Sequence, residues 1–204
     1  MKPVEILSAE HRVIEIMLGC MERMAERVES GGGFHPEHAR QAVDFIRNFA
    51  DKCHHGKEED RLFPAMVSKG VPNESGPIGV MLFEHEQGRN YVAAMASALD
   101  LLEAGEEGGR DTFLFAAGQY VELLRAHIAK EDQILFPLAN RIMNDADHAN
   151  LLNQFDVVER EHMGAGTHEK YLKIAETLGK EYGIDTSAIA AAPASGSCGC
   201  SHHR

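Results

Sequence analysis

The chain has 204 residues, of which 44% are hydrophobic and 25% charged, and these values are typical of one globular domain that carries a tail. Its formal net charge of −12 argues against a nucleic-acid partner and against an anionic membrane surface. No apolar run approaches about 20 residues, and the N-terminus lacks the apolar core of a signal peptide, so we expect a cytoplasmic protein without a membrane span.

Two helices are predicted in the first third of the chain. Residues 4–30 carry apolar side chains at steps of three and four, and His11 interrupts that apolar face before three glycines end the pattern. Residues 36–69 continue with a second helix whose buried face includes His54 and Glu58. Pro64 lies inside this pattern, and we expect it to kink the helix or to end it near Phe63.

The middle of the chain repeats this arrangement. Residues 78–104 form the third predicted helix, with His85 inside its apolar face. Residues 111–143 form the fourth, with His127 and Glu131 facing inward and a proline near its end, as in the second helix. A buried polar side chain costs free energy unless it has a partner, so a histidine in each apolar face requires an explanation.

The last part of the chain looks accessory. Residues 147–181 predict further helix, interrupted by Gly-Ala-Gly at 164–166, and residues 183–204 have the Ala, Ser, Pro and Gly content of a flexible tail. We see no alternation that indicates a strand. The predicted fold is all-α: an antiparallel up-down four-helix bundle with an additional C-terminal helix in residues 1–182, followed by the tail.

One stretch of sequence occurs twice. Residues 54–64 read HHGKEEDRLFP and residues 127–137 read HIAKEDQILFP, 73 residues further on. Each copy places a His and a Glu four residues apart, so that both side chains project from one face of a helix. A Glu-His pair lies 43 residues before the first copy, at His11, and 42 before the second, at His85.

Two similar helical hairpins that face each other would bring four histidines and two glutamates together. Imidazole and carboxylate groups at this spacing suit a borderline metal such as iron or zinc, and dinuclear sites in helical bundles are built in this way. The sequence therefore predicts a dinuclear metal site with six ligands, which are His11, His54, Glu58, His85, His127 and Glu131.

The sequence resembles the hemerythrin-like, HHE cation-binding family over about residues 5–140, and the KE[ED]xxLFP ends of the two copies strengthen the resemblance. The resemblance implies an α-helical bundle with a non-heme centre of two iron ions, bridged by carboxylates and an oxygen, in which zinc could substitute. Carried over residue by residue, the family's ligands fall on the same six positions.

Two departures from the oxygen-carrying hemerythrins stand out. Those proteins have His-x-x-x-His on the third helix, whereas Arg89 lies four residues after His85 here. They have an Asp five residues after the last His, whereas Glu131 follows His127 at four. The predicted site therefore has one histidine fewer, and two histidines per iron leave about one open position on each metal.

The first copy offers a second pair at the same spacing, because His55 and Glu59 are also four residues apart. Superposing the copies places His55 on Ile128 and Glu59 on Asp132. Because isoleucine cannot bind a metal, the symmetric choice is His54 with Glu58. We expect His55 and Glu59 to support the ligands from outside or to face solvent.

Several other side chains have two interpretations. His162 is either a further ligand or, as we favour, a surface residue, and Tyr120 is either a donor near the site or, more simply, part of the core. Cys198 and Cys200 could hold a soft metal, although a disordered tail with a separable role is favoured. We assign no role to the remaining histidines in loops or on polar faces, which are His35, His38, His148 and His168.

Three functions are compatible with the sequence. The favoured one is a diiron protein that binds O2, NO or peroxide. The second is a diiron enzyme that reduces NO, decomposes peroxide or repairs iron–sulfur centres, and it would need an external electron donor because the chain has no flavin or nicotinamide fingerprint. The third is a non-catalytic iron or zinc module.

Overall fold

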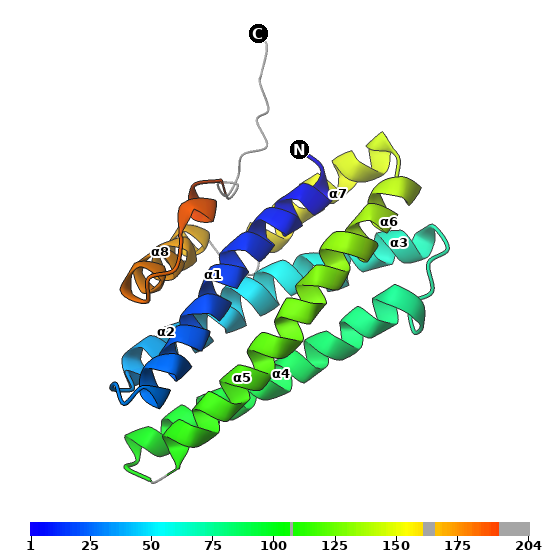
Figure 1. The fold of residues 1–204 in the computed structure, drawn as a ribbon. Coiled ribbons are helices and arrows are strands. Elements are labelled where there is room, and N and C mark those ends of the chain that lie inside the picture. Colours follow the sequence, from blue (N-terminus) through cyan, green and yellow to red (C-terminus); the bar gives the residue numbers. More distant parts are fainter. Residues whose placement is uncertain (107, 161–165, 192–204) are drawn as a thin grey trace.

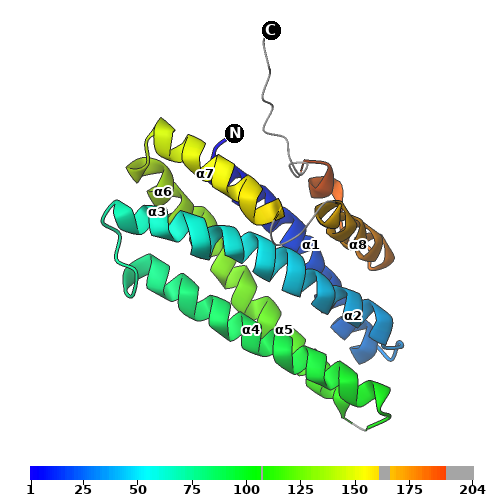
Figure 2. The ribbon, with the colours of Figure 1, turned by 180° about the vertical axis from the view of Figure 1, so that it is seen from behind.

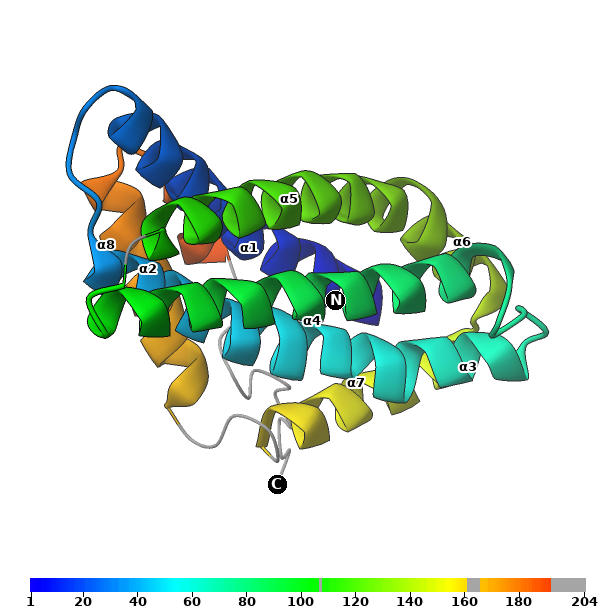
Figure 3. The same ribbon diagram turned by 90° about the horizontal axis from the view of Figure 1, so that it is seen from below.

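The computed structural model of the chain describes residues 1–106, 108–160 and 166–191. The four main helical rods are antiparallel neighbours in all three ribbon views, and α4 lies along α5 (Figures 1, 2 and 3). The described residues form helices, turns and loops with no strand, which confirms the all-α bundle. The rods are α1 (Pro3–Glu29), then α2 (Pro36–Phe45) with η1 (Ile46–His55), η2 (Glu58–Leu62) and α3 (Phe63–Ser68), then α4 (Gly76–Glu103), and finally α5 (Gly109–Lys130) with η3 (Glu131–Leu135) and α6 (Phe136–Ile142).

The second and fourth rods contain π-helical turns, at η1, η2 and η3. Buried side chains in the second rod recur at an unbroken step of four, at Ile46, Ala50, His54, Glu58 and Leu62. In an α-helix with 3.6 residues per turn, each such step drifts by about 40°, so four steps would turn the last side chain about 160° away from the first. The wider π-turns remove this drift and keep the row facing the core.

The prolines in these two rods do not end them. The second rod continues past Pro64 to Ser68 and the fourth continues past Pro137 to Ile142, so of the two alternatives expected at Pro64, a kink or an end near Phe63, the end is excluded. Each proline lies in the first turn of an α-helical segment that follows a π-helical turn. Because the helix changes its hydrogen-bonding pattern at that point, the missing N–H of proline is accommodated without a break.

Two further helices cover the bundle from outside. Helix α7 (Asp145–Val158) contacts α1 and η2, and α8 (Thr167–Glu181) contacts α1 and α2 (Figures 2 and 3). The folded chain extends beyond the expected boundary at residue 183, because Ile184 and the short 3-10 helix η5 (Ser187–Ala191) pack on the core. Cys198 and Cys200 lie outside the described residues.

The core consists of two hydrophobic clusters with a polar layer between them along every rod. One cluster lies toward the N-terminal end of α1 and includes Leu7, Phe63, Met81 and Phe136. The other lies toward the C-terminal end of α1 and includes Ile14, Phe49, Met95 and Phe113. Within the described part of the chain, no helix combines the length and the apolar character that crossing a membrane requires.

Candidate metal centre

The polar layer contains seven histidine and glutamate side chains, each at most 5% exposed. Every rod contributes at least one of them, because each crosses the layer between the two hydrophobic clusters. The structure brings together all six predicted ligands and adds one histidine beside them. They are His11 on α1, His54 and His55 on η1, Glu58 on η2, His85 on α4, His127 on α5 and Glu131 on η3.

These side chains form two groups that share Glu58. In the first group, the ligand atoms of His11, His54, Glu58 and Glu131 all lie within 4.8 Å of one another. The second group meets the same limit and combines Glu58 with three histidines, which are His55, His85 and His127. Each group is compact enough to surround one metal ion.

Two carboxylates connect the groups. The Oε1 atom of Glu58 lies 3.6 Å from Nε2 of His54, while its Oε2 atom lies 3.5 Å from Nε2 of His85. In Glu131, Oε2 lies 3.1 Å from Nε2 of His11 and 3.3 Å from Nε2 of His127. Both carboxylates therefore face both groups, as bridging ligands between two metals would.

The layer fits metal ions because most of its inward-facing polar atoms have no hydrogen-bond partner. The Nε2 atoms of His11 and His54 and all four carboxylate oxygens of Glu58 and Glu131 are buried without a hydrogen-bond partner. Nε2 of His85 faces Nε2 of His127 at 3.1 Å. Orphaned buried polar atoms are costly, and the convergence of so many lone pairs suits cations.

The opposite ring nitrogen of every one of these histidines is held by a carboxylate. In each case Nδ1 donates to the carboxylate. His11 donates to Asp132 at 3.0 Å, His54 to Glu10 at 2.9 Å and His55 to Asp51 at 3.4 Å. His85 donates to Glu59 at 2.6 Å and His127 to Glu84 at 3.0 Å. Carboxylate–histidine–metal triads fix the imidazole tautomer in this way and direct the Nε2 lone pair at the metal.

These contacts explain the parts of the duplicated sequence that are not ligands. The Glu of each Glu-His pair accepts from the histidine of its own copy, and the lysine of the copy bonds that Glu, as Lys57 does with Glu10 and Lys130 with Glu84. The acidic residue that follows the glutamate of each copy accepts from a histidine of the other hairpin: Glu59 accepts from His85, and Asp132 accepts from His11. The repeat therefore encodes the ligands together with their supports.

His55 differs from the expectation. It is only 5% exposed, its ring stacks on His85 with centroids 3.8 Å apart, and it belongs to the second group of potential ligands. Glu59, in contrast, lies outside the layer as expected and supports His85. A sequence signal that points to His55 is Arg89, which stands where the oxygen-carrying hemerythrins have a further histidine.

The remaining histidines divide into two kinds. His148 and His168 are buried, at 8% and 2% exposure, so their expected placement in loops or on polar faces is wrong. His35 and His38 are half-buried beside Glu37, away from the layer. His162 lies outside the described residues.

Burial and charge shift the pKa values of the groups in the layer in different directions. Burial, and then repulsion by Glu131, raises the pKa of Glu58 well above its ordinary value. Burial opposes ionisation of Glu131 too, but the nearby His127 and His11 lower the pKa of Glu131 well below its ordinary value. Burial would lower the pKa of His127, yet Glu131 and Glu84 raise it to about 9. Metal cations would compete with protons for these groups.

A pocket of about 200 Å³ reaches this layer from the side formed by η1, α4 and α5. His55 and His85 form its inner wall and Arg89 lines it as well. Tyr120 is buried and also lines the pocket, so it lies near the centre as well as in the core. Gly88 faces Tyr120, where an added Cβ would lie 3.5 Å from the ring.

An antiparallel helical bundle that encloses a layer of histidine and glutamate ligands defines a helical metal-binding protein. The family model described as the hemerythrin HHE cation binding domain matches residues 2–139, so the chain belongs to that family. Uncharacterized proteins of Mycobacterium bovis and Mycobacterium tuberculosis are 22% identical over 180 residues, which cover 88% of this chain and 70% of each relative. No solved structure matches the chain.

Proposed function

We propose that this protein holds two iron ions in the polar layer and binds O2, NO or peroxide there. One metal would be held by the first group of histidines, His11 and His54. The second metal would be held by His55, His85 and His127. Glu58 and Glu131 would bridge the two. The convergence of orphaned Nε2 and carboxylate atoms in one buried layer is the observation that carries this proposal.

The two halves are unequal under this assignment. With both carboxylates shared, the half with two imidazoles has one more free position than the half with three. Iron supplies a redox-active ion that can take a small ligand at such a position. The chain's own residues orient the imidazoles, exclude bulk water from the layer and admit a small molecule through the pocket beside His55.

Iron content with an optical spectrum tests the proposal. Reconstituted protein should contain two irons per chain, and its spectrum should change on exposure to O2 or NO. A firm value of one iron, or a spectrum indifferent to every small ligand, would contradict the proposal. Stable zinc with no iron retention would support the non-catalytic module instead.

The role of His55 can be tested in the same way. Because His55 would supply one of three imidazoles in its half, His55→Ala should reduce the metal content below two. His168→Ala is the matched control, since His168 is an equally buried histidine outside the layer. Retention of both metals with unchanged affinity in His55→Ala would return the assignment to six ligands.

A further inference from the structure

Arg89 lies four residues after His85 on α4. The oxygen-carrying hemerythrins have a histidine at this position. Its guanidinium contacts two carboxylates at once. Nε donates to Oδ1 of Asp51 at 2.9 Å, and a terminal nitrogen donates to Oε1 of Glu59 at 2.6 Å. These two carboxylates come from different segments, η1 and η2, so Arg89 joins α4 to the second rod.

The same two oxygens hold two histidines of the layer. Oδ1 of Asp51 accepts from Nδ1 of His55, and Oε1 of Glu59 accepts from Nδ1 of His85. One guanidinium therefore fixes the carboxylates that orient both rings. These two rings are also the ones that stack on each other, 3.8 Å apart.

We infer that Arg89 is a positioning residue that holds His55 and His85 as a stacked pair in the metal centre, so that His55 takes the place of the absent histidine on α4. Its effect on metal retention rests on the proposed function, whereas its effect on the two rings does not. The flat fork of donors in a guanidinium can satisfy two carboxylates in fixed directions, which a lysine ammonium cannot do in the same way.

The other histidines of the layer do not depend on Arg89. His54 is held by Glu10, which is paired with Lys57. His127 is held by Glu84, which is paired with Lys130. His11 is held by Asp132, which Arg12 contacts. Loss of Arg89 should consequently disturb one pair of rings and leave the others in place.

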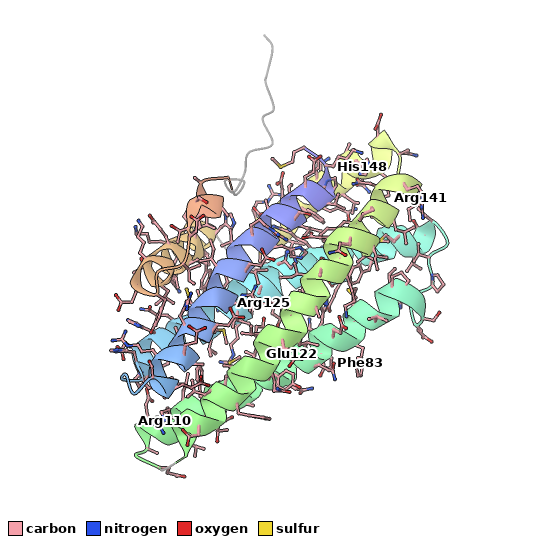
Figure 4. The ribbon with its side chains drawn as sticks, in the orientation of Figure 1. Phe83, Arg110, Glu122, Arg125, Arg141 and His148 are labelled. Carbon is pink, nitrogen blue, oxygen red and sulfur yellow. The ribbon has the colours of Figure 1, made fainter. Side chains whose placement is uncertain are left out.

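Arg89→Gln, Arg89→Lys and Arg125→Gln test this inference. Arg125 lies on α5 (Figure 4) and is the matched control because it donates two hydrogen bonds to Glu22 at the surface. Its side chain is 42% exposed, close to the 36% of Arg89. Arg125→Gln therefore removes the same charge and a similar pair of bonds away from the centre. Arg89→Lys keeps the charge without the fork, and it serves if Arg89→Gln does not fold.

The decisive measurement uses metal-free protein. Imidazole nitrogen chemical shifts report which ring nitrogen carries the proton. In the wild type, His55 and His85 should show the Nδ1–H tautomer. In Arg89→Gln both should become mixtures of tautomers, with a smaller change in Arg89→Lys, while His54 stays unchanged. A mere loss of stability would not select these two rings.

Metal extraction by a chelator is the second measurement. The removal of a group that supports metal ligands typically costs 10–100-fold in affinity, so one metal should leave Arg89→Gln faster by about that factor. Arg125→Gln should match the wild type. Unchanged His55 and His85 tautomers in Arg89→Gln would overturn the inference. If the wild type bound no metal pair, the proposed function would fail, while the tautomers would still decide the role of Arg89.

Discussion

Individual residues of the duplicated stretch have equivalent partners but unequal surroundings, and the two lysines show this most clearly. Lys57 is fully buried, bonds Glu10 and Glu159, and lies 5.9 Å from the Phe155 ring. Lys130 makes the equivalent bond to Glu84, but its side chain is 36% exposed. Helix α7 packs on α1 and η2 and brings Phe155 beside Lys57.

This difference predicts unequal costs for the same substitution. Lys57→Met leaves buried carboxylates without their cation and should lower the free energy of unfolding by about 3–5 kcal/mol. Lys130→Met breaks a pair whose lysine is partly exposed to solvent, so it should cost less than Lys57→Met, about 1 kcal/mol. Urea unfolding of the two metal-free variants measures both. Equal costs would show that α7 does not shield Lys57 from water.

The cost of Lys57→Met should also depend on pH. Burial alone would raise the pKa of Glu10, but the Lys57 charge and the bond from His54 lower it from 4.5 to about 2. A lowered carboxyl pKa contributes stability that is present above about 4.5 and is lost as the pH falls through about 2. The difference in stability between the wild type and Lys57→Met should therefore be full at pH 6 and shrink as the pH falls from 4.5 toward 2.

At the scale of elements, the helices could be predicted from the spacing of apolar residues within each segment. Six residues of the polar layer could be predicted from the duplicated stretch. Steps of three and four identified α1 and α4, and the repeat paired His54 with His127. The π-helical turns were missed although their signal was present, since buried residues at an unbroken step of four do not suit an α-helix.

His55 was missed for the opposite reason. Comparing the two copies selects only positions that have a possible ligand in both. Because Ile128 is the equivalent of His55, the comparison argued against a ligand at His55. The layer is asymmetric in this structure, because η1 contributes both His54 and His55 whereas α5 contributes His127 alone. Only the packing of α4 against η1 brings His55 beside His85, and that packing is tertiary.

The C-terminal element offers a prediction of its own. Ile184 would lie 3.2 Å from a Cβ at Gly19 on α1, and Ala188 and Ile189 also pack on the core. A chain that ends at Gly183 should lose about 1–3 kcal/mol of stability because these apolar contacts disappear. A chain that ends at Ala191 keeps them and should unfold like the full chain. Equal stability of the two truncated chains would mean that η5 contributes nothing to the fold.

Across the whole molecule, the polar layer separates two hydrophobic clusters. The four rods together contribute its seven buried histidine and glutamate side chains. Five outer carboxylates hold the histidines, and all five are contacted by a cation, which is Arg12, Lys57, Arg89 or Lys130. This shell orients the rings without satisfying the inward-facing atoms. Cations that bound in the layer would satisfy these atoms and so stabilise the bundle.

Metal removal should therefore destabilise the entire bundle. A ligand at about 1,000 times its Kd stabilises the native state by about 4 kcal/mol. In a chain of this size, 1 kcal/mol shifts Tm by about 2–4 °C, so complete chelation should lower Tm by roughly 8–16 °C. Glu58→Gln is the control: it removes a carboxylate shared by both halves, so it should start with less metal and respond less to the chelator. If wild-type Tm stayed unchanged after verified removal of all metal, the polar layer would be stable without cations, and the orphaned atoms would need another partner.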